Sequence, residues 1–429
     1  MATVKLKNIS TFDVTFKNSK NVPFQRWYPY IEGYSPNFVF SLIDRYCKGA
    51  TLIYEPFAGT GTTLFASDIK GINTVYSEVN PLLRFLIDTK IKVMSLTGEE
   101  RYSLASGLKA LIPRILSEAK KCVPSSKLHQ SYKNAFGSSV YFPTDQYKLV
   151  LKLRSYIDKK RDEGDLLTAD LLTVAVFSSL LPVSYLKKQG DVRFKTKAER
   201  AHKVLMEEVL PIKLEHMVED ITNFAYSMSM HHTLLCENAK NIGSVDLNEK
   251  ISAVITSPPY LNGTNYFRNT KLELWFLGYV NSDADLRHFR DEALTSGIND
   301  VKASYLKECV HLNSKTLNEA LAELDGKAYD KRIPLMARCY FNEMIQLFEG
   351  LAKHLKNNAY VLIDLGDSMF SNVHIKTDII LAEVLRDFGY TLEERIVLRQ
   401  RRSRNGKLLS QVLLVMKYNN GTFKEAKVG

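Results

Sequence analysis

The spacing of apolar residues predicts alternating strands and helices over the first part of the chain. Apolar residues at helical spacing follow Ser35 and Pro36, a pair typical of a helix start. A short apolar run over 51–54 then reads as a buried strand, followed by a glycine-rich turn and a helix that ends at Gly71. A second short strand ends at Glu78 and leads into another helix. This order predicts the start of a βαβ unit.

The pattern changes between residues 91 and 230, where long segments show a sustained rhythm of about 3.6 residues. Two examples are "EERYSLASGLKALIPRILSEAKKC" and "DLLTADLLTVAVFSSLLPVSYLKK". No buried strand is evident within this stretch. We therefore predict a large helical insertion over 91–230.

Alternation resumes after residue 231. Strand-like runs over 233–238, 251–257 and 359–367 are followed by two C-terminal runs, "IVLRQ" and "LSQVLLVMKY". The linker between these last two contains Asn405-Gly406, a pair suited to a tight hairpin turn. The prediction is an α/β unit built from 1–90 and 231–429, with a mostly parallel sheet closed by an antiparallel hairpin.

The segment 281–335 has mixed charge and weak periodicity, and it is long for a connection. Two interpretations stay open. It acts either as a lid or DNA-contacting excursion that orders on binding, or as a plain surface insertion.

Composition narrows the class of protein. The 429 residues are 45% hydrophobic and 24% charged, as in ordinary globular proteins, and a net charge of +11 favours a polyanionic partner without requiring one. Five cysteines are scattered without a CxxC pair, so no metal site is predicted and a reducing cytoplasm fits. No apolar stretch reaches the roughly 18 residues of a membrane span, and the N-terminus lacks the apolar core of a signal peptide. We expect a soluble intracellular protein with no membrane partner.

The glycine turn, "EPFAGTGTT", narrows the classes of ligand that the chain can bind. Gly59 and Gly61 allow backbone amides to approach a ligand in front of a helix N-terminus. A dinucleotide fingerprint needs a third glycine where the chain has Leu64, and the Gly-Lys-Ser/Thr of a phosphate-binding loop is missing. The alternative is that these glycines form only a tight turn and bind no ligand.

Two acids flank this turn. Glu78 ends the second strand about where an α/β sheet presents a carboxylate to ribose hydroxyls. Glu55 precedes the turn and either holds its amides or meets a cationic ligand. A cofactor with a ribose and a positive charge but no phosphate, such as S-adenosylmethionine, satisfies this set.

The sequence "SPPY" follows the strand-like run at 251–257. Pro258 and Pro259 fix the backbone and remove two amide donors, which leaves carbonyl groups free to accept. The Ser257 side chain and the Pro258 carbonyl can accept the two hydrogens of an exocyclic amine, while the Tyr260 ring stacks on a planar base. Two such acceptors stabilise a pyramidal nitrogen, so direct attack on a sulfonium methyl follows without a covalent enzyme intermediate. A base in duplex DNA must first be flipped out. The alternative is a strand-terminating loop with Tyr260 in the core.

These motifs resemble those of S-adenosylmethionine-dependent amino-group DNA methyltransferases, especially the cytosine-N4 members with a Ser-Pro-Pro-Tyr motif. "EPFAGTGTT" is similar to their cofactor motif and "ITSPPY" to their catalytic motif. "RWYPYIEGYSPNFV" is similar to an N-terminal cofactor-side segment, and "YVLIDLGDS" to a late strand motif. The resemblance covers about residues 25–90 and 231–418. It implies a Rossmann-like methyltransferase fold with a seven-stranded sheet, and recognition elements placed in the middle insertion.

The resemblance also implies site residues and partners. The catalytic set is Ser257, Pro258, Pro259 and Tyr260. The set for S-adenosyl-L-methionine is Tyr30, Glu55, Phe57, Ala58, Gly59, Thr60, Gly61, Thr62, Glu78, Asn80, Glu237 and Asn238. Of these, Glu78 is expected at the ribose and Glu237 or Asn238 near the adenine, although the family more often has aspartate there. The implied setting is a restriction-modification or defence system acting on double-stranded DNA at the nucleoid of a bacterial or archaeal cell, with room for a cognate restriction nuclease.

Two basic segments, 187–203 and 399–407, are candidates for DNA contact. Their predicted DNA-binding residues are Lys187, Lys188, Arg193, Arg399, Arg401, Arg402 and Arg404. A solvated helix face or hairpin is the alternative for each segment. The target also stays open, because adenine-N6 members more often carry Asp or Asn where Ser257 stands. The competing functions are adenine-N6 or RNA-base methylation, and a DNA-binding relative without turnover.

Overall fold

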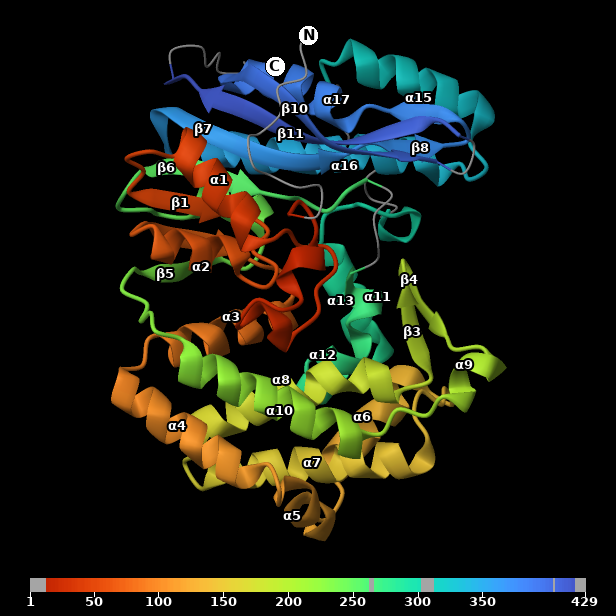
Figure 1. Ribbon diagram of the computed structural model, residues 1–429. Helices are drawn as coiled ribbons and strands as arrows, with labels where there is room; N and C mark the ends of the chain where they lie inside the picture. The colour runs from red at the N-terminus through yellow and green to blue at the C-terminus, as the bar shows by residue number, and fades with distance from the viewer. Residues whose placement is uncertain (1–12, 262–265, 302–311, 404–405, 421–429) are drawn as a thin grey trace.

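A computed structural model describes residues 13–261, 266–301, 312–403 and 406–420. Its main feature is a seven-stranded sheet (Figure 1). In spatial order the strands are β10 (Tyr390–Arg402), β11 (Leu408–Tyr418), β7 (Leu355–Gly366), β6 (Ile251–Thr256), β1 (Leu52–Glu55), β2 (Asn73–Ser77) and β5 (His232–Cys236). Neighbours from β7 to β5 pair in parallel, whereas β11 is antiparallel to both β7 and β10. The predicted Rossmann-like fold, with its C-terminal antiparallel hairpin, is confirmed.

The order of the strands creates a binding edge between β1 and β6. Chain connections run outward from β1 through β2 to β5 on one side and from β6 through β7 on the other. Because β1 and β6 are adjacent and parallel, the loops that leave their carboxyl ends lie side by side. Open α/β sheets bind ligands at such a switch point. The glycine turn and the Ser-Pro-Pro-Tyr motif are these two loops.

Alternate residues of the inner strands pack on opposite faces of the sheet, as expected for strands buried on both sides. On one face, Ile53 joins an apolar cluster with α1 (Pro36–Tyr46) and α2 (Thr62–Ile69). On the other face, Tyr54 joins a cluster with α16 (Arg332–Ala352). This second face is also covered by α17 (Thr377–Leu385), α15 (Lys315–Lys327) and the 3-10 segment η3 (Ala239–Ser244).

A second, helical layer lies at the far end of the molecule from β10 and β11 (Figure 1). It begins where α3 (Pro81–Met94) leaves the sheet, and its helices are α4 (Gly98–Leu111), α5 (Ile115–Lys121), α6 (Ser126–Phe136), α7 (Thr144–Asp162), α8 (Leu166–Val183), α9 (Lys197–Ala201) and α10 (Met206–Asn223). Apart from α9, which has no buried residue, these helices form one apolar cluster with α12 (Lys271–Leu277).

Helix α8 corrects one expectation. The prediction that no apolar stretch reaches membrane-spanning length is wrong, because α8 has 18 residues and a mean hydropathy of 1.9, enough by length and composition for a span. In the structure 72% of this helix is buried inside the protein. Its apolar side chains face the surrounding helices, which is typical of a core helix.

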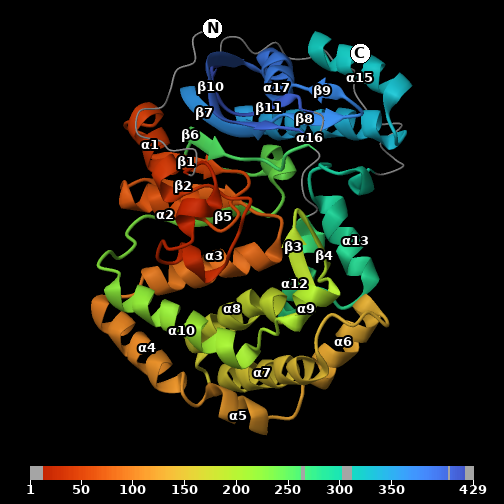
Figure 2. The ribbon, with the colours of Figure 1, turned by 45° about the vertical axis from the view of Figure 1, so that its right-hand side comes forward.

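The insertion predicted over 91–230 is helical except for one short hairpin, which the sequence analysis did not predict. Two short antiparallel strands, β3 (Leu186–Gln189) and β4 (Asp191–Phe194), form a hairpin after α8. The chain reverses at Gly190, whose φ of +74° suits glycine. The apolar rhythm of α8 continues through Leu186 in the sequence, so it conceals the start of this hairpin. The hairpin contacts α11 (Tyr266–Asn269) and points from the helical layer toward the sheet (Figure 2).

The remaining elements connect or border these layers. They are η1 (Phe16–Ser19), η2 (Gln25–Trp27), α11 (Tyr266–Asn269), α13 (Asp283–Glu292), η4 (Ile298–Asp300), β8 (Ser368–Phe370), β9 (Val373–Ile375) and η5 (Arg386–Phe388). Within the predicted excursion at 281–335, α13, η4 and α15 lie on either side of 302–311, which is outside the described residues. Arg404 and Asn405 of the C-terminal hairpin turn are also outside the described residues.

Candidate active site

The glycine turn and the Ser-Pro-Pro-Tyr motif line one cavity of about 240 Å³. Most of the residues predicted for the cofactor and for catalysis contribute to its wall. They are Tyr30, Phe57, Ala58, Gly59, Thr60, Thr62, Glu78, Asn80, Ser257, Pro258, Pro259 and Tyr260. Four other predicted residues, Glu55, Gly61, Glu237 and Asn238, are not part of this wall.

The turn depends on both of its glycines. Gly59 and Gly61 have φ values of +56° and +85°, which favour glycine. An added Cβ at Gly59 would lie 3.1 Å from the Tyr30 ring, and one at Gly61 would lie 2.8 Å from the Phe65 ring. The Gly61 amide also donates to the Ala58 carbonyl at 2.8 Å, which closes the turn in front of α2. Gly61 therefore shapes the turn from behind the wall.

Glu78 ties the turn to the end of β2. One carboxylate oxygen accepts from the Gly59 amide and the other from the Asn80 amide, both at 2.8 Å. Burial raises the pKa of Glu78 to about 7, although these two amide donors oppose the shift. Each carboxylate oxygen has a second lone pair, and the side chain lines the cavity. Glu78 is thus placed to accept hydrogen bonds from vicinal hydroxyls.

Glu55 supports the turn from beneath. Its carboxylate accepts from the Phe57 amide at 3.1 Å, from Thr63 Oγ1 at 2.8 Å and from the Tyr34 hydroxyl at 2.5 Å. Burial raises its pKa to about 7. Of the two roles considered for Glu55, the contacts match that of holding the turn amides.

The N-terminal segment reaches the turn because Asp220 of α10 anchors it. The buried Asp220 carboxylate accepts from the Phe24 amide, from Trp27 Nε1 and from Arg26 Nε, each at 2.9 Å. Between these anchors, Gln25 Oε1 lies 3.3–3.4 Å from two threonine hydroxyls of the turn. The helical layer thus fixes the segment that brings Tyr30 over the glycine turn.

The Ser-Pro-Pro-Tyr motif leans on strand β7. Ser257 Oγ donates toward the Asp364 main-chain oxygen at 3.3 Å and the Asp364 carboxylate at 3.4 Å, and the Tyr260 hydroxyl donates to the same carboxylate at 3.2 Å. The Tyr260 ring packs against Gly366, where an added Cβ would be 2.7 Å from two ring carbons. Any side chain at Gly366 would push this ring into the cavity.

Asp364 is a site residue that the sequence pattern did not single out. It lines the cavity, it is 3% exposed, and Gln411 Nε2 donates to both of its carboxylate oxygens at 2.9 Å. Burial raises its pKa to about 6, while the hydrogen bonds and the positive charge of Arg399 oppose that shift. The sequence did contain a signal for Asp364, which is an acid inside the apolar run "YVLIDLGD". Acidic side chains are rarely buried unless they are paired or hydrogen-bonded, so such a position indicates a specific role.

Glu237 and Asn238 are held outside the cavity wall by other partners. The Glu237 carboxylate pairs with Arg84 at 3.0 Å, and its side chain is 66% exposed. Asn238 Nδ2 donates to the Glu292 main-chain and side-chain oxygens at 2.9 and 3.0 Å. In this structure neither side chain is directed at the space in front of the glycine turn.

The predicted DNA-binding residues fall into two groups. In the first, Lys187 and Arg193 pair with Glu199 at 2.9 and 2.8 Å, and Lys188 pairs with Glu32 at 2.7 Å. Their positive charge is therefore partly neutralised by acids of this chain.

The second group lies on β10. Arg399 lines the cavity itself, whereas Arg401 and Arg402 are exposed where β10 extends toward its hairpin turn. Arg402 Nη1 donates to the Gly406 carbonyl at 3.0 Å. Arg404 lies outside the described residues.

Comparison with known proteins finds Type II methyltransferases that are similar to this chain at low sequence identity. No protein-family model matches it. It is 24% identical over 447 residues to the Type II methyltransferase M.BsoBI of Geobacillus stearothermophilus, covering 93% of this chain and 84% of that protein. It is also 24% identical over 422 residues to the Type II methyltransferase M.AvaI of a Nostoc species, covering 91% and 84%. Among solved structures, the rRNA methyltransferase aviRa of Streptomyces viridochromogenes aligns with a TM-score of 0.30 and 8% identity, over 89% of this chain and 85% of that one. The two sequence matches support the methyltransferase resemblance drawn from the two motifs.

Proposed function

We propose that the protein is a DNA methyltransferase that transfers the methyl group of S-adenosylmethionine to the N4 amine of cytosine within a specific double-stranded sequence. The observation that carries this proposal is the single cavity lined by both the glycine turn and the Ser-Pro-Pro-Tyr motif. The similarity to Type II methyltransferases over nine-tenths of the chain supports it. That similarity also favours a role as the modification half of a restriction-modification system, with a cognate nuclease as its counterpart.

The end of the cavity beside the glycine turn carries groups whose chemistry fits S-adenosylmethionine. Glu78 offers carboxylate oxygens for ribose hydroxyls, and Gly59, which has no side chain of its own, lines the cavity with its backbone. The aromatic rings of Tyr30 and Phe57 form apolar walls. When bound, S-adenosylmethionine supplies an electrophilic methyl group on a positively charged sulfur. The carboxylate of Glu78 favours such a cationic ligand over a phosphate-bearing one.

The other end of the cavity fits an exocyclic amine. Because the Ser257 hydroxyl donates to Asp364, its oxygen lone pairs are left to accept one amine hydrogen. Pro258 contributes a carbonyl for the second hydrogen. Two acceptors favour a pyramidal nitrogen with a localised lone pair, which lowers the barrier to direct methyl transfer. As positive charge develops on that nitrogen, the Asp364 carboxylate stabilises it through Ser257.

The target base must leave the helix to reach this position. Tyr260, fixed against Gly366 and Asp364, presents its ring to the cavity as a stacking surface for the flipped base. Ser257 stands where adenine-N6 members of the resembled family more often have Asp or Asn, which favours cytosine. Contacts to the DNA backbone are proposed for Arg401, Arg402 and Arg404, and sequence recognition for the insertion at 91–230.

Mass analysis of the reaction product tests this proposal. The purified protein is incubated with S-adenosylmethionine and bacterial genomic DNA from an unmodified host, and the DNA is digested to nucleosides. The expected product is N4-methylcytosine. N6-methyladenine would replace the cytosine assignment with the adenine alternative, and the absence of any methylated nucleoside would contradict the function itself.

A further inference from the structure

The β3–β4 hairpin presents one polar face to solvent. Because strand side chains alternate, Leu186 and Val192 point toward the body of the protein and are buried. Lys187, Gln189 and Arg193 share the opposite face, since Lys187 and Arg193 are direct cross-strand partners and Gln189 is two residues from Lys187. The outer face therefore carries hydrogen-bonding groups along its whole length.

The tip of this hairpin is fixed beside the cavity by Asn269. The buried Asn269 side chain accepts from the Val192 amide at 2.8 Å and donates to the Gly190 carbonyl at 3.3 Å. Asn269 ends α11, which contributes two aromatic side chains to the cavity wall. On the inner face of the hairpin, Lys188 pairs at 2.7 Å with Glu32, another wall residue. The hairpin thus has a set position relative to the site of methyl transfer.

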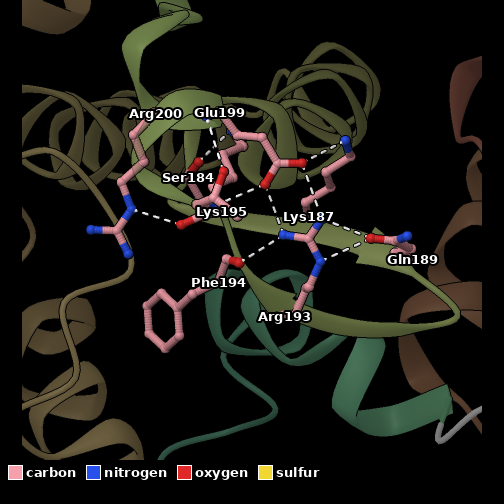
Figure 3. Close-up of polar contacts among 9 residues, drawn as sticks. Ser184, Lys187, Gln189, Arg193, Phe194, Lys195, Glu199 and Arg200 are labelled. Atoms are coloured by element: carbon pink, nitrogen blue, oxygen red, sulfur yellow. Dashed lines mark hydrogen bonds and ion pairs between the residues drawn. The ribbon is translucent and has the colours of Figure 1, made fainter.

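Arg193 uses all of its hydrogen-bond donors within the protein (Figure 3). Its Nε and Nη2 donate to Gln189 Oε1 at 2.9 and 2.7 Å. Its Nη1 donates to the Phe194 carbonyl at 2.9 Å, and Nη1 and Nη2 donate to the two carboxylate oxygens of Glu199 at 2.8 and 3.0 Å. A guanidinium has five N–H groups, and these contacts engage all five. Arg193 is therefore committed to holding the hairpin and has no donor left for a phosphate.

Glu199 anchors this arrangement to α9. It accepts from Lys187 Nζ at 2.9 Å and, as part of a capping box, from the Thr196 amide at 2.9 Å. The hydrogen bonds from Arg193, with those from Lys187, hold the pKa of Glu199 well below its usual range. The carboxylate stays ionised at neutral pH, so the link from hairpin to helix persists.

The side chain of Gln189 can only donate hydrogen bonds to a ligand. Both lone pairs of its Oε1 are engaged by Arg193, because a carbonyl oxygen has two such positions. Its Nε2 group has two N–H donors with no acceptor within the described part of the chain, and the residue is exposed at the hairpin tip. Figure 3 shows this amide at the outer end of the Arg193 side chain. The orientation of the amide is thereby fixed before any ligand arrives.

We propose that the β3–β4 hairpin reads one base pair of the recognition sequence in the major groove, with Gln189 Nε2 as the reading group and guanine as the preferred base. This inference rests on the proposed DNA methyltransferase function. Guanine presents two acceptors, N7 and O6, on its major-groove edge, whereas adenine presents one acceptor and one donor. The usual pairing of glutamine with adenine needs a free Oε1, which Arg193 occupies. Arg193 is a positioning residue in this account.

A methylation assay on duplexes with randomised bases around the target tests the proposal. Gln189→Ala is expected to lose its guanine preference at a single position by about 5- to 150-fold, the range for one specific base contact. Arg193→Lys keeps the charge but not the fork that orients Gln189, so it should relax the same position. The double variant should add little to either single change. Lys109→Gln, an exposed charge change on α4, is the control and should keep the wild-type sequence profile.

The salt dependence of DNA binding separates positioning from phosphate contact. The slope should be unchanged in Arg193→Lys and Arg193→Gln, whereas loss of a phosphate contact would reduce it by about 0.9. Cofactor affinity of each variant reports that the fold is intact. If wild type methylates DNA and Gln189→Ala keeps the same preference at every position, the hairpin proposal is overturned and the proposed function stands. If wild type methylates no duplex in the library, both are overturned.

Discussion

Replacing Asp364 with asparagine is the change that most sharply tests the chemistry of the cavity. The carboxylate receives four hydrogen bonds: two from Gln411 and one each from Ser257 and Tyr260. Asparagine is nearly the same size but offers one acceptor oxygen and an NH₂ group, so at least one donor of the wild-type protein then faces another donor. The negative charge that orients Ser257 is also lost.

The magnitude follows from those contacts. Loss of one preorganised group that stabilises transition-state charge typically lowers kcat by about 10²- to 10³-fold, or about 3–4 kcal/mol. One mismatched buried donor should lower the free energy of unfolding by about 1–3 kcal/mol. Burial raises the pKa of Asp364 to about 6, so the ionised, active form is lost as pH falls through that value. The kcat of the wild type should therefore rise with pH and level off above about 6, and this rise should be missing in Asp364→Asn.

Single-turnover transfer of a tritiated methyl group to DNA, measured from pH 5 to pH 9, gives the rate of methyl transfer and its pH dependence. Asp367→Asn is the matched control, because it removes the same charge three residues away at a carboxylate that pairs with His374 and does not line the cavity. Its kcat should stay near that of wild type. A wild-type rate and pH profile in Asp364→Asn, with cofactor binding intact, would refute the role assigned to this carboxylate.

Three further predictions concern the amine site, the fold and the DNA surface. Ser257→Ala should abolish most methyl transfer while leaving the Kd for S-adenosylmethionine near normal in calorimetry, and strong residual transfer would remove Ser257 from the mechanism. Asp220→Ala should lower the free energy of unfolding by about 3–5 kcal/mol in urea, because it strands buried donors around Arg26. Glu219→Ala, whose exposed carboxylate pairs with the same arginine, should cost at most about 1 kcal/mol, and equal losses would argue against Asp220 as the anchor. Replacing Arg401 and Arg402 with glutamine should reduce the salt slope of DNA binding by about 2, whereas an unchanged slope would exclude this hairpin from the interface.

The sequence predicted the central sheet because its strands have an unambiguous local pattern. The run ending at Tyr54 is followed at once by a glycine turn, and the run ending at Thr256 by two prolines, so each strand has a clear end. Neighbouring loops at one sheet edge then follow from the general architecture of parallel sheets. For this reason the shared cavity was foreseeable from two motifs that are nearly 200 residues apart.

Other features depend on tertiary contacts that local patterns do not report. The hairpin at 186–194 merges at sequence level with the apolar rhythm of α8, and only the reversal at Gly190 marks it. Asp364 was overlooked because it lies within a strand that otherwise reads as core. The segment 187–203 is basic, as its sequence indicates, but the prediction of a phosphate-binding surface assumed that its cations are free. Glu199 and Glu32, one of them distant in sequence, pair with three of those cations.

A structure with S-adenosylhomocysteine and a duplex that contains the methylated sequence would test the central claim most directly. We expect the sulfur to lie in the cavity between Gly59 and Ser257, and the amine of a flipped cytosine to contact Ser257 and the Pro258 carbonyl. A cofactor bound away from the glycine turn, or a target base held on another surface, would contradict it.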